Sequence, residues 1–169
     1  MSDGNLLQNT GIQNANFGLR KDGSFVTGYL SREDVADPAR PFEQLIAGVV
    51  WLVRNGKVYV DDALDYEQVD QSFADLLSAR VAIGHDAGGR LVLLQFDGRS
   101  GERGIDLYTM AELLVSYGVV NAANLDGGGS VAAVRWNTLI SYPSDSCRDD
   151  SRFSCERAVT SVVCFGERG

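Results

Sequence analysis

A chain of 169 residues with 44% hydrophobic and 22% charged residues has the size and composition of one globular domain with its own core. Its formal net charge of −8 argues against a nucleic-acid partner and an anionic membrane partner, because both require a basic stripe. The longest apolar run, residues 45–53, has the length of a strand and is too short to span a bilayer.

Three pairs of extended segments follow one another along the chain, each pair divided by a turn sequence. Residues 16–30 contain the turn Lys21-Asp22-Gly23, residues 48–60 contain Asn55-Gly56, and residues 81–98 contain a turn at 86–89. Asp-Gly and Asn-Gly between extended runs are typical of β-hairpins. The series predicts an α+β fold with a mixed, largely antiparallel sheet built from hairpins. The absence of long strand–helix alternation disfavours a doubly wound fold.

One or two helices are expected to pack on this sheet. Residues 105–118 place apolar side chains at helical spacing, with Asp106 as the cap at the start and Gly118 at the end. Residues 66–79 carry a weaker form of the same pattern. Residues 31–46 are polar and contain the two early prolines, which predicts a surface loop with a short helical turn.

Three cysteines lie near the end of the chain, at Cys147, Cys155 and Cys164. A zinc site would need all three thiols and His85, and it is disfavoured because no Cys-x-x-Cys pair is present. A short disulfide loop from Cys147 to Cys155 is favoured, with Cys164 unpaired or bonded outside this chain. Disulfides indicate an oxidising compartment, whereas residues 1–11 lack the basic and apolar segments of a signal peptide. The two observations point in opposite directions.

The segment VVNAANLDGGGSVAAV, residues 119–134, places Gly127–Gly129 directly after Asp126 at the end of an apolar run. Glycine N–H groups can converge on an anion. The string 127–132 also fits a loose dinucleotide-binding pattern, but that pattern needs a following helix and residues 130–142 look extended. A plain strand-to-strand turn and a binding site have equal weight on these residues alone. The position of Asp126, beside backbone that a ligand can approach closely, favours the site.

Three longer segments carry a family resemblance: ARVAIGHDAGGRLVLLQFDGRS, NAANLDGGGSVAAV and SYPSDSCRDDSRFSCERAVTSVVC. Together they resemble the phosphodiester glycosidase family, and the last segment points to its animal members. With residues 11–31 and 41–59 the resemblance covers nearly the whole chain. It implies that residues 1–169 are the C-terminal part of a larger catalytic domain whose N-terminal part is missing. A truncated chain would explain cysteines of an oxidising compartment without a signal peptide, and the partner of Cys164 could then lie in the missing part.

The resemblance also implies an activity and a location. It predicts a Golgi hydrolase of the secretory pathway that removes N-acetylglucosamine from N-acetylglucosamine–phosphate–mannose diesters. These diesters lie on the phosphorylated high-mannose glycans of lysosomal enzymes, and their cleavage exposes mannose 6-phosphate. No cofactor is expected and no metal site is assigned. His85, Asp86 and Asp97 could contribute metal ligands, but their spacing matches no recognised site, so metal dependence is left open. A non-catalytic carbohydrate- or phosphate-binding module and an inactive fragment are the alternatives.

The chemistry of a sugar 1-phosphodiester suggests which residues act. The leaving group is a stable phosphomonoester anion, so the site needs cations or N–H groups for the phosphate and a carboxylate for the anomeric side. Asp126 and His85 are the predicted catalytic residues. The predicted phosphate- and substrate-binding residues are Arg80, Arg99, Gly127, Gly128, Gly129 and Ser130. A surface salt bridge is the alternative for Arg80, a structural role is the alternative for His85, and the second carboxylate of a glycosidase pair is not identified.

Overall fold

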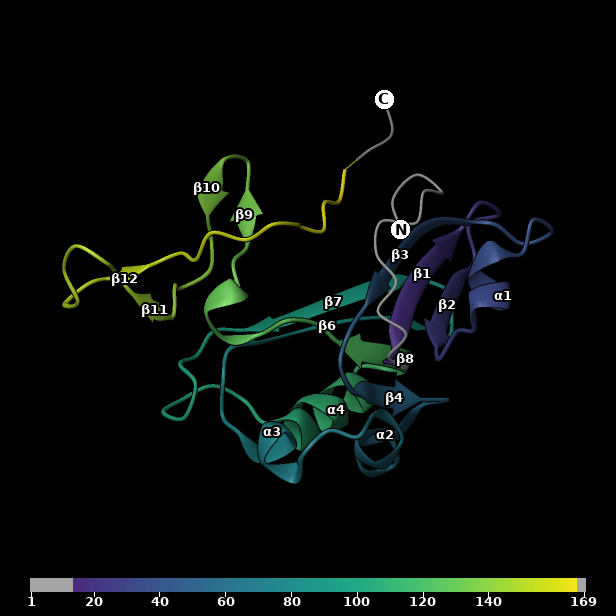
Figure 1. Ribbon diagram of the computed structural model, residues 1–169, viewed down its shortest axis with the longest axis horizontal. Helices are drawn as coiled ribbons and strands as arrows, with labels where there is room; N and C mark the ends of the chain where they lie inside the picture. The colour runs from purple at the N-terminus through teal and green to yellow at the C-terminus, as the bar shows by residue number, and fades with distance from the viewer. Residues whose placement is uncertain (1–13, 167–169) are drawn as a thin grey trace.

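The computed structural model describes residues 14–166, which fold around two antiparallel sheets (Figure 1). The larger sheet has five strands in the order β5-β4-β8-β6-β7, and the smaller has the order β2-β1-β3. Their bounds are β1 Asn16–Arg20, β2 Phe25–Gly28, β3 Phe42–Ala47, β4 Trp51–Arg54, β5 Lys57–Val58, β6 Arg80–Asp86, β7 Leu91–Phe96 and β8 Val119–Asn124. All strand pairs in both sheets are antiparallel, as the hairpins predict.

Three helices cover one face of the five-stranded sheet, and Figure 1 shows them together below β4 and β8. They are α2 Val60–Glu67, α3 Gln71–Asp75 and α4 Leu107–Ser116, while the short α1 Arg32–Ala36 lies beside the smaller sheet. The main core forms between these helices and the sheet, where Leu52, Met110 and Leu114 are completely buried. A smaller cluster of Phe17, Ile83 and Leu125 joins the two sheets on the other face. Within residues 14–166 no helix is long and apolar enough to cross a membrane.

Two small hairpins follow β8 and lie at the opposite end of the long axis from the three-stranded sheet (Figure 1). A 3₁₀ turn, η1 Gly128–Ser130, leads into the first hairpin, formed by β9 Val134–Arg135 and β10 Thr138–Leu139. The second hairpin pairs β11 Asp145–Ser146 with β12 Ser154–Cys155. The extended conformation expected for residues 130–142 is therefore present only in part, since it starts with a helical turn.

The three predicted hairpins are confirmed by the strand register. Leu19 pairs with Phe25, Arg54 pairs with Lys57, and His85 pairs with Leu91, so each turn falls at the predicted sequence. The segment 31–46 is only partly as predicted. It contains the expected helical turn as α1, but its end is the strand β3, because Phe42 is buried against the smaller sheet.

The predicted helices differ in outcome. The helix within 105–118 is confirmed as α4, and the Asp106 side chain caps it by accepting the Thr109 N–H at 2.8 Å. One helix over 66–79 is wrong. α2 ends at Glu67, and the residue after it, Gln68, adopts φ +55°. α3 begins directly after Asp70, whose side chain accepts the Ser72 N–H. Side-chain capping by Asp70 stabilises a new helix start there, which interrupts the apolar spacing.

A buried carboxylate at the end of α2 holds the point where the chain passes between the sheets. Glu67 is 7% exposed, and it accepts the Val50 N–H at 2.8 Å and the Trp51 N–H at 3.0 Å. It also accepts the Tyr29 hydroxyl at 3.1 Å. Burial and the neighbouring Glu67 charge raise the pKa of Tyr29, so this phenol remains a donor. The carboxylate thus replaces the strand partners that Val50 and Trp51 lack on that side.

Glu67→Gln should lower the free energy of unfolding by about 1–3 kcal/mol, because one of the two amide N–H groups loses its charged acceptor while buried. Urea unfolding followed by circular dichroism measures this change. Asp65→Asn is the matched control, since it alters an exposed carboxylate on the same helix. Equal stability of both variants would contradict the role assigned to Glu67.

Candidate active site

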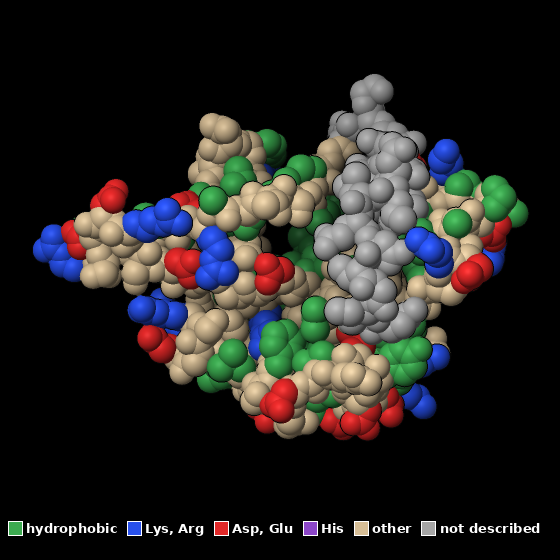
Figure 2. All heavy atoms as spheres, in the orientation of Figure 1, with side chains coloured by type: hydrophobic (Ala, Val, Ile, Leu, Met, Phe, Trp, Pro, Cys, Tyr) green, Lys and Arg blue, Asp and Glu red, His purple; other side chains and the backbone are tan. Residues whose placement is uncertain are grey.

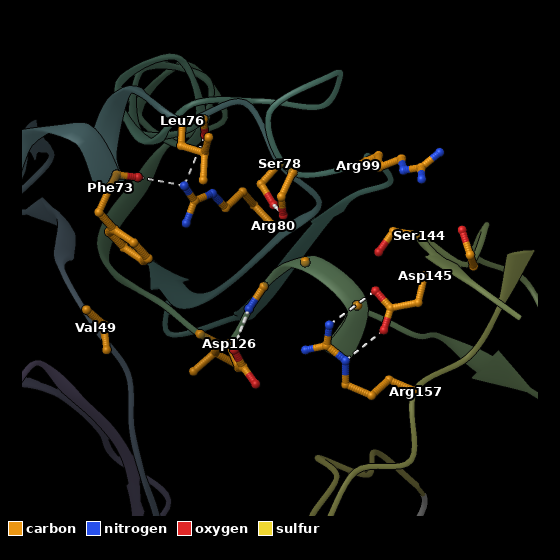
Figure 3. A pocket seen from close by; sticks show the side chains of 16 residues that line it. Val49, Phe73, Leu76, Ser78, Arg80, Arg99, Asp126, Ser144, Asp145 and Arg157 are labelled. Atoms are coloured by element: carbon orange, nitrogen blue, oxygen red, sulfur yellow. Dashed lines mark hydrogen bonds and ion pairs between the residues drawn. The ribbon is translucent and has the colours of Figure 1, made fainter. Parts of the chain in front are cut away.

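A cavity of about 550 Å³ lies where the end of β8, the start of β6 and the β11–β12 hairpin meet (Figure 3). Its lining includes both carboxylates and cations. The lining residues are Val49, Phe73, Leu76, Ser78, Arg80, Arg99, Ser100, Leu125, Asp126, Gly127, Gly128, Gly129, Ser144, Asp145, Ser146 and Arg157. Figure 2 shows acidic and basic side chains side by side over the part of the molecule that holds the β11–β12 hairpin. The volume falls in the range of small-molecule sites.

Asp126 is held at the cavity by the strand that precedes it. β8 runs between β4 and β6, and the pairing continues beyond the strand, where the Leu125 N–H donates to Val81 O at 2.8 Å. The Asp126 side chain is exposed, and among residues 14–166 it accepts only the N–H of the next residue, Gly127, at 2.9 Å. Within that part of the chain its carboxylate is neither packed inside nor in an ion pair, and it faces the hollow (Figure 3).

The glycine run packs against the backbone that leads into β6. A Cβ on Gly127 would lie 2.8 Å from Ala79 O, and the Gly128 N–H donates to the same oxygen at 2.9 Å. Gly128 has φ +58°, a conformation that glycine adopts without strain. The run is thus a close-packed turn that also lines the cavity. The amides of Gly127 and Gly128 already have protein acceptors, and Ser130, whose N–H donates to Gly127 O, does not line the cavity.

Arg80 lies in the cavity wall, and it is not the surface residue of the alternative interpretation. The residue is 2% exposed, its Nη2 donates to Phe73 O at 2.7 Å and to Leu76 O at 3.0 Å, and its guanidinium stacks on the Phe73 ring. Within residues 14–166 it forms no ion pair, and its buried Nε has no partner. Burial lowers the pKa of Arg80, and the charge of Asp106 opposes that shift. An unneutralised cation beside the hollow favours an anionic ligand.

His85 is not brought to the cavity. Side chains alternate along a strand, and on β6 Ala82 faces the helices whereas Ile83 faces the smaller sheet. Arg80 therefore shares the face of Ala82, and His85 shares that of Ile83, near the other end of the strand. The imidazole stacks on Phe25 with ring centroids 6.0 Å apart, and its Nδ1 lies 3.0 Å from Asp86 O. His85 is not among the residues that line the cavity, and its catalytic role remains a prediction from the sequence.

Two further charged residues of the cavity were missed from the sequence. Asp145 and Arg157 form a two-pronged ion pair, with Nε to Oδ2 at 2.8 Å and Nη2 to Oδ1 at 3.1 Å. The segment quoted for the family resemblance contains both, but several other Asp and Arg residues surround them and give no reason to select this pair. By contrast Arg99, which was predicted, lines the cavity with a partly exposed side chain 3.4 Å from Glu102.

The predicted disulfide between Cys147 and Cys155 is present and closes the β11–β12 hairpin. Asp145 lies two residues before the first cysteine and Arg157 two residues after the second, so the bond holds the two ends of the ion pair together. Cys164 is an exposed thiol. Disulfides of this kind are typical of proteins that fold in the secretory pathway.

The chain is similar to known proteins over nearly its whole length. A model of the phosphodiester glycosidase family matches residues 1–166. The N-acetylglucosamine-1-phosphodiester α-N-acetylglucosaminidase of mouse is 49% identical over 175 residues, which cover 99% of this chain and 34% of the mouse protein. The human protein of the same name is 51% identical over 164 residues, covering 93% of this chain and 32% of the human protein.

A solved structure is similar over the same length. The zebrafish N-acetylglucosamine-1-phosphodiester α-N-acetylglucosaminidase catalytic domain, auto-inhibited by its pro-peptide, superposes with a TM-score of 0.94 and 45% identity. The match covers 98% of this chain and 56% of that structure. This chain therefore spans about a third of the length of the mouse and human relatives and rather more than half of the zebrafish catalytic domain.

Gly127→Ala should destabilise the protein by about 1–3 kcal/mol, because the added methyl group meets the Ala79 carbonyl and must displace the turn. Thermal unfolding measures the change. Gly166→Ala serves as the control, since a Cβ there meets nothing within 4 Å. If both alanine variants melt at the same temperature, the close packing of the turn does not constrain the site.

Proposed function

Because the chain belongs to the phosphodiester glycosidase family, we propose that its cavity hydrolyses N-acetylglucosamine 1-phosphodiesters. The observation that carries the proposal is that the wall of one cavity holds the carboxylate of Asp126 and the buried cation of Arg80, neither of which forms an ion pair with the described residues 14–166. The names of the mouse, human and zebrafish relatives support the same chemistry.

The proposed reaction breaks the bond between the anomeric carbon and the phosphate oxygen. The electron pair of that bond leaves with the phosphomonoester, which is a stable anion and needs little help from a general acid. Water adds to the anomeric carbon and loses a proton, which gives free N-acetylglucosamine. Catalysis then depends on stabilising charge: a carboxylate beside the oxocarbenium-like sugar and cations beside the departing phosphate.

The residues of the cavity are suited to these two needs. The exposed carboxylate of Asp126 is free either to bind sugar hydroxyls or to accept the proton of the attacking water. Arg80 supplies a positive charge at low dielectric, where it acts more strongly on an anion than a surface arginine does. Arg99, in the same lining, is a further phosphate ligand at the mouth. His85 has no step in this proposal.

The proposed natural substrates are N-acetylglucosamine–phosphate–mannose diesters on the high-mannose glycans of lysosomal enzymes. Their cleavage would expose mannose 6-phosphate. A cavity of about 550 Å³ accommodates a phosphorylated hexosamine while the rest of a glycan stays outside. The proposed location is the Golgi, in keeping with the disulfide between Cys147 and Cys155.

Asp126→Asn should lower kcat for a synthetic N-acetylglucosamine 1-phosphodiester by about 100-fold or more, because the amide neither accepts a proton nor carries the charge that stabilises the sugar cation. The release of N-acetylglucosamine measures the rate. Asp149→Asn is the matched control, as it changes an exposed carboxylate outside the cavity lining.

Hydrolysis by Asp126→Asn at the rate of the Asp149→Asn control would contradict the role of Asp126. A second measurement separates an enzyme from the binding-module alternative. A module binds the diester, seen as a rise in melting temperature, but releases no N-acetylglucosamine in the unsubstituted protein.

A further inference from the structure

The ion pair between Asp145 and Arg157 is built into the cavity and does not lie loosely on its rim. A Cβ on Gly129 would collide with both the Asp145 carboxylate and the Arg157 guanidinium, so the pair rests directly on the glycine turn. Asp145 opposes Cys155 across the β11–β12 hairpin, and the Cys147–Cys155 disulfide closes that hairpin. The disulfide therefore joins the backbone just after Asp145 to the backbone just before Arg157, while the side chains of the pair contact the turn that follows Asp126.

The pair uses only one edge of the guanidinium. Asp145 accepts from Nε and Nη2 of Arg157, and the third nitrogen points toward Asp126 and the hollow (Figure 3). An arginine carries five N–H donors, and among the residues that the structure describes only Asp145 accepts from those of Arg157. Hydrogen bonds to Asp145 raise the pKa of Arg157, and the charge of Asp126 adds to the increase, which places Asp126 within electrostatic range.

Arg80 and Arg157, which line the cavity together with Asp126, differ in how many of their N–H groups a ligand can reach. Arg80 is 2% exposed, and its Nη2 is occupied by two carbonyl oxygens. The Arg157 side chain is 50% exposed and is anchored on one edge only. A guanidinium with a fixed position and a free edge is suited to bind two phosphate oxygens at once.

We propose that Arg157 binds the phosphate of the substrate through its free edge, and that Asp145 is the positioning residue that orients it. This inference rests on the proposed function and names the phosphate ligand of that same cavity. Arg80 then supplies charge from the wall, while Arg157 makes the direct contact. The Asp145 carboxylate has a second consequence, because its negative charge weakens the hold on a phosphomonoester dianion and so promotes release of the product.

The test measures binding of inorganic phosphate by isothermal titration, and hydrolysis of the synthetic diester, in four variants. Arg157→Gln should raise the Kd for phosphate about 10- to 100-fold and lower kcat/KM by a similar factor, since charge-assisted hydrogen bonds are lost. Asp145→Asn should instead lower that Kd about 2- to 5-fold, because a nearby negative charge is removed. It should also lower kcat, because the phosphomonoester product is then held more tightly and leaves more slowly. A merely structural role would weaken phosphate binding in both variants.

A matched ion pair in the same hairpin supplies the controls. Arg152 and Asp150 also form a two-pronged pair, with Nε to Oδ1 and Nη2 to Oδ2, but neither residue lines the cavity. Arg152→Gln and Asp150→Asn should therefore leave both the phosphate Kd and kcat/KM unchanged. If Arg157→Gln unfolds, Arg157→Lys replaces it. That variant keeps the charge and should weaken phosphate binding less than tenfold while lowering kcat, because an ammonium cannot reproduce the paired contact.

Two results overturn the inference: an unchanged phosphate Kd in the Arg157 variant that folds, or no phosphate binding by the unsubstituted protein. A protein that binds phosphate through Arg157 but releases no N-acetylglucosamine overturns the proposed function and supports the inference. Failure of the two proposals is therefore distinguishable.

Discussion

The structure depends on how the chain passes from the smaller sheet into the larger one at residues 48–51. There the Val49 N–H donates to Asn124 O at 2.9 Å, and the Asn124 N–H donates back to Val50 O at 3.0 Å. Glu67 accepts the Val50 and Trp51 N–H groups from the helix side. Residue 48 must be a glycine, because a Cβ there would collide with the same Asn124 carbonyl. This crossing fixes the end of β8, and with it the residues that follow, which form the wall of the cavity.

Backbone contacts after the end of β8 determine the shape of the cavity wall more than side-chain contacts do. The glycine turn approaches Ala79 O closely, and this approach sets Asp126 beside the start of β6, where Arg80 lies. A turn with side chains would separate the two charged groups. The main role of the glycines is therefore to allow this close approach, since two of their amides already donate to acceptors within the protein.

The three arginines that line the cavity have different environments. Arg80 is buried against carbonyl oxygens and an aromatic ring, whereas Arg157 is anchored by Asp145 and Arg99 lies near Glu102. A buried cation keeps a strong field because solvent does not screen it, and a partly neutralised one exchanges ligands more readily. Such a division suits the proposed reaction, in which the site would attract a diester and then release a more highly charged monoester.

The sequence by itself determined the hairpins, the capped helix α4, the short disulfide and the cluster of Asp126 with its glycines. These features depend on neighbouring residues, so local turn and capping chemistry specifies them. Only the tertiary structure decided that Arg80 is buried, that His85 faces the other side of its strand, and that Asp145 pairs with Arg157 on the glycine turn. Those outcomes depend on which face of a strand is turned toward the helices and on contacts between segments that are distant in the sequence. Local sequence patterns specify neither.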